Sequence, residues 1–264
     1  MFKTFLKGCV IGIANIIPGV SGGTFAVILG VYQSLINSLE ELISFRFKKE
    51  SIVFLLLIGM GAISGVVIFA KLINYCMGIN TANTYALFIG LIIGSIPLIE
   101  NRYKLRHNLS LINIICFCVS FSCMVILSYL PEFKSLSYEL ILITLSGFIA
   151  MSAMIVPGIS GSHILLIIGT YNLILKAISE FNFKLLIPFM VGALVGVITT
   201  AKSIKWLLKY KQYQTYSFIM GLVVGSIPYL WFKIDTINNP ILFIIILVVS
   251  IVSVISLDKL LARQ

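Results

Sequence analysis

The chain has 264 residues, of which 59% are hydrophobic and only 11% are charged. Soluble domains carry about 25% charged residues, so the composition excludes a soluble globular protein and predicts an all-α protein that crosses a membrane several times. The net charge of +10 comes without a basic run interleaved with aromatic residues, which excludes a nucleic-acid partner. The five cysteines lie in apolar stretches without a nearby histidine, so we expect no metal and no other cofactor.

The first apolar element is too long for one spanning helix. Residues 8–39 carry no charged side chain, whereas a membrane crossing needs about 20 residues. Pro18-Gly19 breaks this run near its middle and leaves two half-helices that are too short to cross the hydrocarbon core. We therefore expect a re-entrant helical hairpin over residues 5–37, with its tip inside the membrane. Three spans follow it, at about 52–76, 82–99 and 108–130.

The second half of the chain repeats this order. Residues 140–175 form a second long apolar run, broken at Pro157-Gly158, and predict a hairpin over 138–176. Three spans again follow, at about 185–208, 213–232 and 238–259. In the hairpins residue i matches residue i + 139, and from residue 61 to residue 97 the offset is 131. The chain is thus predicted to be a tandem duplication, with repeat one at 1–134 and repeat two at 135–264.

The number of crossings predicts the topology. A hairpin returns to the side on which it began, so three further crossings place the second repeat upside down, as an inverted-topology repeat. Most of the 19 Lys and Arg then lie on the side of the N-terminus. By the positive-inside rule, we expect both termini to be cytoplasmic.

Both breaks carry the sequence Pro-Gly-x-Ser-Gly. Unpaired backbone amides in hydrocarbon are costly, so such a break persists only where protein buries it or a polar cavity solvates it. The second half-helix begins just after each motif, and its amide donors, positive dipole end and neighbouring hydroxyls suit a phosphate or carboxylate. The alternative is a kinked helix with a serine cap. No catalytic residue is expected, and the candidate substrate-binding residues are Asn15, Pro18, Gly19, Ser21, Gly22, Gly23, Thr24, Pro157, Gly158, Ser160, Gly161, Ser162 and His163.

Two lysines inside predicted spans complete the candidate site. Lys71 and Lys202 occupy the same repeat position, and inversion places them near opposite membrane faces. Each either extends to the lipid headgroups or guides an anionic headgroup toward the nearer tip. His163 either titrates near neutral pH and couples transport to protons or is a hydrogen-bonded structural residue. Gly61 with Gly65, and their counterparts Gly192 and Gly196, predict close helix packing that permits sliding.

The residues 14–24, the second motif at 157–162 and the repeated Gly-Ser-Ile-Pro at 94–97 and 225–228 resemble the bacterial polyprenyl-phosphate transporter family, long known only as a domain of unknown function. The resemblance covers essentially the whole chain. It implies a flippase of the bacterial cytoplasmic membrane that moves undecaprenyl phosphate, the lipid carrier of peptidoglycan and other cell-wall precursors, from the outer to the cytoplasmic leaflet for recycling. Its expected partners are this lipid and the membrane, and the oligomeric state and energy source stay open.

Two other functions remain alternatives. Undecaprenyl-pyrophosphate phosphatases resemble this plan but carry Pro-Gly-x-Ser-Arg-Ser, whereas Gly22 and Gly161 stand here where the arginine would clamp a phosphate. Without that arginine or a closely spaced glutamate pair in a span, we expect no enzyme. A carrier of a small soluble anion would share the same hairpins. A lateral, lipid-lined entrance favours the lipid substrate, and a sealed aqueous vestibule favours the small anion.

Overall fold

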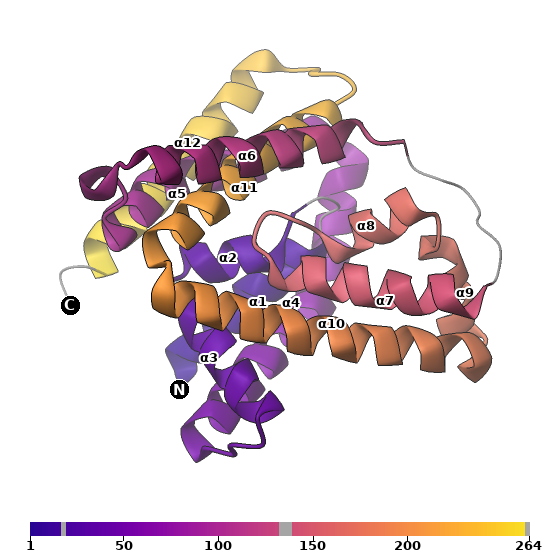
Figure 1. The fold of residues 1–264 in the computed structure, drawn as a ribbon. Coiled ribbons are helices and arrows are strands. Elements are labelled where there is room, and N and C mark those ends of the chain that lie inside the picture. Colours follow the sequence, from indigo (N-terminus) through magenta and orange to yellow (C-terminus); the bar gives the residue numbers. More distant parts are fainter. Residues whose placement is uncertain (17–19, 132–138, 262–264) are drawn as a thin grey trace.

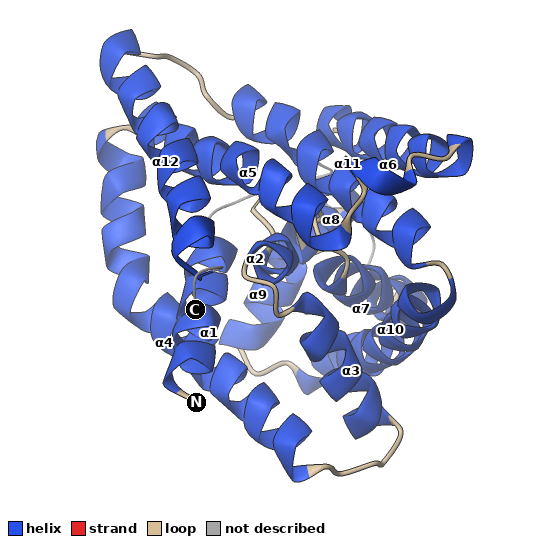
Figure 2. Cartoon of the chain, turned by 90° about the vertical axis from the view of Figure 1, so that its left-hand side faces the viewer, coloured by secondary structure: helices blue, strands red, loops and turns tan. Residues whose placement is uncertain are grey.

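A computed structural model describes residues 1–16, 20–131 and 139–261, and within these ranges the chain forms helices and no strand (Figures 1 and 2). The first half contains α1 (Phe2–Ile16), α2 (Gly22–Ile28), α3 (Tyr32–Ile43), α4 (Lys49–Ile79), α5 (Thr81–Tyr103), a short 3-10 helix (Arg106–Asn108) and α6 (Leu111–Tyr129). The second half contains α7 (Leu140–Ile155), α8 (Gly161–Ile168), α9 (Tyr171–Ser179), α10 (Phe183–Tyr210), α11 (Gln212–Phe232) and α12 (Pro240–Leu261).

The long helices coincide with the predicted spans. Among the described residues, α4, α5, α6, α10 and α11 are each long and apolar enough to cross a membrane. The sixth predicted span coincides with α12, in which the described apolar stretch is shorter. Two further bent pairs of short helices bring the number of candidate spans to seven if each pair is one span. The chain is therefore a multi-pass membrane protein, as its composition predicts.

Each predicted hairpin is broken twice, where we expected a single break. Beyond the Pro-Gly motif the chain forms only the seven-residue α2 or the eight-residue α8, and then bends by 118° or 108° into α3 or α9. The second bends contain Gly30 and Gly169, whose φ angles of +68° and +84° suit glycine and end a helix. The expected long second half-helices are therefore wrong. The matching Gly-x-Tyr sequences at 30–32 and 169–171 carried the signal for this bend.

The helices pack in long pairs. Helix α1 lies along α4 and α7 along α10, while α6 lies along α11 and α12 along α5 (Figure 1). The last two pairs join the two halves of the chain. Helices α5 and α11 are mostly buried, whereas few residues of α4, α6 and α10 are buried within the protein. The molecule thus has a centre built on α2, α5 and α11.

Glycines allow the closest of these pairings. A Cβ atom placed on Gly61 would overlap the carbonyl oxygen of Phe5, and one on Gly192 would overlap that of Thr144. Gly65 and Gly196 lie equally close to the same partner helices, α1 and α7. These contacts confirm the predicted close packing of small residues at the two helix pairs.

Replacing Gly192 with Ala is expected to lower the free energy of unfolding by about 1–3 kcal/mol, because the new methyl group must displace the backbone of α7. The better helix propensity of alanine offsets less than about 1 kcal/mol of this loss. Gly59→Ala is the matched control on α4, since no atom lies within 4 Å of its added Cβ. Thermal unfolding of the purified proteins compares them, and equal midpoints for both variants would contradict the close packing.

Candidate functional site

The serines of the two Pro-Gly-x-Ser-Gly motifs have the same backbone conformation. Ser21 and Ser160 are the N-cap residues of α2 and α8, with φ and ψ of −100° and 128° in the first and −97° and 125° in the second. Neither serine side chain makes a capping hydrogen bond to its own helix. The geometry therefore does not support the interpretation of these serines as ordinary helix caps.

The tips meet each other although they lie far apart in the sequence. The backbone N–H of Gly158 donates to Thr24 Oγ1 at 2.8 Å. A Cβ on Gly23 would lie 3.2 Å from Cα of Pro157, so the missing side chain allows this approach. At the start of α3, Tyr32 Oη donates to the carbonyl oxygen of Ile155 at 3.2 Å, close to the end of α7. Three polar or close contacts thus join the two halves at the tips.

Asn15 supplies the cap that Ser21 does not. It lies near the end of α1, and its Oδ1 accepts a hydrogen bond from the N–H of Gly22 at 2.9 Å. One of the amide groups left without a partner at the start of α2 is satisfied in this way. Sequence reasoning placed Asn15 beside the break, and the structure assigns it the positioning of α2.

The second tip is the more accessible of the two. Ser160 and Ser162 lie with their hydroxyl oxygens 2.8 Å apart, and Ser162 is exposed. Ser21 is buried at the first tip.

His163 follows the second tip in α8 and is buried. Its Nδ1 lies 3.0 Å from Oη of Tyr229 on α11. This geometry favours the hydrogen-bonded structural interpretation of His163.

The remaining predicted residues lie apart from this meeting point or outside the described residues. Lys71 and Lys202 are exposed on α4 and α10, and Lys202 lines a separate hollow of about 380 Å³. Pro18 and Gly19 fall within residues 17–19, which lie outside the described residues. Their counterparts, Pro157 and Gly158, are buried.

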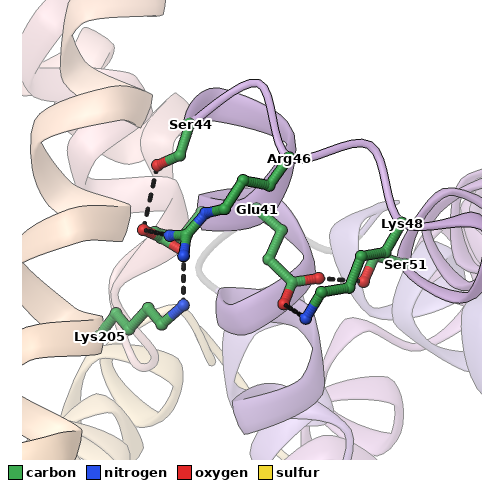
Figure 3. A network of polar contacts seen from close by, with 7 residues as sticks. Glu41, Ser44, Arg46, Lys48, Ser51 and Lys205 are labelled. Atoms are coloured by element: carbon green, nitrogen blue, oxygen red, sulfur yellow. Dashed lines mark hydrogen bonds and ion pairs between the residues drawn. The ribbon is translucent and has the colours of Figure 1, made fainter.

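A charged cluster that sequence reasoning did not single out joins α3 to α10. The carboxylate of Glu40, at the end of α3, accepts hydrogen bonds from Ser44, Arg46 and Lys205 (Figure 3). Glu41 on the next position binds Lys48 and Ser51. Glu40 is buried and Lys205 lies on the second half of the chain, so this ion pair is a further link between the halves. The only signal in the sequence was a glutamate pair at the edge of a charged loop.

Apolar helices long enough to span a membrane, together with two helix breaks whose residues contact each other, define a multi-pass membrane protein. A family model described as undecaprenyl phosphate translocase-like matches residues 11–257, and the chain belongs to this family.

Two relatives cover most of the chain. A protein of Vibrio cholerae named polyprenyl-phosphate transporter is 32% identical over 87% of this chain and 77% of its own length. A protein of Staphylococcus aureus with the same name is 32% identical over 95% of this chain and 92% of its own length. No solved structure matches the chain.

Proposed function

We propose that this protein moves undecaprenyl phosphate from the outer to the cytoplasmic leaflet of a bacterial membrane, without enzymatic turnover, and holds the headgroup at the two tips. The observation that carries the proposal is the meeting of the tips, with serine side chains that do not cap their own helices. The names of the two relatives support the substrate class.

The chemistry of the second tip suits a phosphate headgroup. Helix α8 begins at Gly161, so the amide groups of its first turn lack partners within the helix. The helix dipole places partial positive charge at this end. The hydroxyls of Ser160 and Ser162 lie within hydrogen-bond distance of each other, so one donates to the other and the second is left as a donor beside the helix end. A phosphate oxygen can therefore accept several hydrogen bonds here without a basic side chain at the tip.

We propose further that residues 1–134 and 135–264 are inverted repeats with both termini cytoplasmic. Equivalent contacts support this, because Gly61 packs on Phe5 of α1 as Gly192 packs on Thr144 of α7. Rocking of the two repeats about the tips would expose the headgroup first to one side and then to the other. In this proposal Lys71 and Lys202 guide the headgroup near opposite faces.

The test uses purified protein in liposomes that contain undecaprenyl phosphate. Movement of the headgroup between leaflets is followed while phosphate release is assayed with the pyrophosphate form. We expect headgroup movement without phosphate release. In Ser160→Ala the rate of this movement is expected to fall about tenfold or more, because a hydrogen bond to a charged group contributes about 1.5–3 kcal/mol. Ser21→Ala is also expected to lower the rate of headgroup movement.

Ser203→Ala is the matched control, because Ser203 is exposed on α10 and belongs to neither tip. It is expected to transport at the wild-type rate. Release of phosphate would overturn the proposal in favour of a phosphatase, and neither movement nor release would overturn it in favour of a soluble-anion carrier. Loss of folded protein in the tip variants, matching their loss of transport, would remove the argument for headgroup binding.

A further inference from the structure

A cavity at the far end of α2 combines positive charge with apolar walls. It measures about 430 Å³ and lies among α1, α2, α5 and α12. Apolar side chains from all four helices line it, among them Val10, Phe25, Leu98 and Val254. The basic side chains that line it are Lys3, Lys7 and Arg102.

Two of these cations are held in place by the last carbonyl groups of α2. Lys7 Nζ donates to the carbonyl oxygen of Leu29 at 2.9 Å. Arg102 Nη1 donates to the carbonyl oxygens of Val27 and Ile28 at 3.2 and 3.1 Å. Cations are favourable at a helix C-terminus, so these contacts orient the side chains. A carbonyl oxygen is a neutral acceptor and does not cancel the full charge of Lys7.

Capping of α2 by itself does not account for the cavity. A helix of seven residues has few carbonyl groups to satisfy, and Lys3 lines the same space in addition to the two capping cations. The walls are almost entirely apolar, which a water-filled vestibule for a small anion would not require. Basic side chains together with apolar walls match an anionic headgroup attached to an apolar chain.

The cavity is connected to the first tip by α2 itself. This helix begins after Ser21 and ends before Leu29, a length of about 10 Å at 1.5 Å per residue. Phe25 and Ile28 of the same helix line the cavity. A headgroup that leaves the tip therefore meets these cations within the length of one short helix.

Two of the three cations of this cavity, Lys3 and Lys7, have no basic counterpart in the other half of the chain. Gly8 packs against the backbone of Ile58 as Gly147 packs against Phe189, which supports the offset of 139 at this place. By that offset the counterparts of Lys3 and Lys7 are Leu142 and Ser146. Carried on to Arg102, the offset of 131 gives Lys233, so the pair Lys3 and Lys7 is what distinguishes this half of the chain from the other.

We propose that this cavity binds the phosphate headgroup of a lipid, with Lys3, Lys7 and Arg102 facing the phosphate and the first part of the hydrocarbon chain along the apolar walls. The inference rests on the proposed function in one respect, because the transported lipid is the occupant that we expect. In the proposed topology the site lies on the cytoplasmic side, where it holds the headgroup after it leaves the tips.

The experiment labels the full-length protein in liposomes with a polyprenyl phosphate that carries a photoreactive diazirine in its first isoprene units. Mass spectrometry then locates the labelled residues. We expect labelling of α1 and α5 at the cavity, lowered about tenfold by Lys7→Met, which removes the charge but keeps most of the apolar stem. Lys3→Met is a second variant, since it lowers the positive charge of the cavity and leaves intact the hydrogen bonds of Lys7 and Arg102 to the end of α2.

Lys49→Met is the matched control, because Lys49 is exposed at the start of α4 and lies outside the cavity. This variant is expected to be labelled as the wild type is.

Competition distinguishes the two lipids that could supply the phosphate, the polyprenyl carrier lipid and an ordinary membrane phospholipid. Displacement by farnesyl phosphate alone would assign the site to the carrier lipid, and displacement also by phosphatidylglycerol would assign it to membrane phospholipid in general. Labelling that is displaced equally by neutral farnesol and is unchanged in both lysine variants would overturn the proposal.

The readout also separates this inference from the proposed function. Ser160→Ala should impair transport yet leave the labelling of the cavity dependent on Lys7. If no transport occurs while Lys7-dependent labelling persists, the proposed function fails and the lipid phosphate site stands. If transport occurs without such labelling, the proposed function stands and this site fails.

Discussion

Replacing Gly158 with Ala is expected to lower the free energy of unfolding by about 2–5 kcal/mol and to abolish transport. Gly158 has a φ of +93°, a conformation in which an L-residue loses about 1–2 kcal/mol. A Cβ on this residue would also lie 2.8 Å from backbone atoms of Leu222 on α11, and such overpacking costs about 1–3 kcal/mol more. The tip would have to move away from α11 and from Thr24.

Denaturant or thermal unfolding of the purified protein measures the loss of stability, and the liposome assay measures transport. Gly78→Ala is the control, because a Cβ on Gly78 meets no atom within 4 Å and its φ is negative. If Gly158→Ala and Gly78→Ala unfold at the same midpoint, the second tip is not packed against α11 in the way described.

Thr24→Val is expected to destabilise the protein by about 1–3 kcal/mol, because it leaves the buried N–H of Gly158 without its acceptor. Valine has nearly the volume of threonine, so the change tests the hydrogen bond between the tips and not the space that the side chain fills. Thr24→Ser keeps the hydroxyl and is expected to retain most of the stability. The unfolding midpoints are expected to fall in the order wild type, Thr24→Ser, Thr24→Val, and thermal unfolding of the three purified proteins measures them.

A threonine that merely fills space would give another order, with valine tolerated and the smaller serine destabilising. That outcome would mean that the two tips pack without the polar contact. Transport is expected to follow the same order as stability, since the proposal requires both tips to be held together.

Much of the fold could be predicted from the sequence because a membrane imposes local requirements. A span must be apolar and about 20 residues long, so runs of uncharged residues placed α4, α5, α6, α10, α11 and α12 within a few residues. The Pro-Gly pairs likewise marked the first break of each long apolar run. The second bends at Gly30 and Gly169 were missed, because hydropathy continues unchanged through them and a single glycine does not by itself set a positive φ angle.

Within the candidate site, the sequence predicted residue types but not their partners. It placed Asn15, Thr24 and His163 beside the breaks. The tertiary structure showed that Asn15 caps α2, that Thr24 accepts from the opposite tip and that His163 contacts Tyr229. Each of these roles depends on a backbone or side chain that arrives from another segment.

By itself, the sequence determined the membrane class, the order of the six long apolar helices and the first break of each long apolar run, because these follow from local hydropathy and from residues that interrupt a helix. The tertiary structure decided which groups meet. Lys7 and Arg102 reach the last carbonyls of α2, and Glu40 reaches Lys205 on α10. A hydrogen bond or ion pair requires a separation of a few ångströms between distant parts of the chain, and only packing of the helices sets that distance.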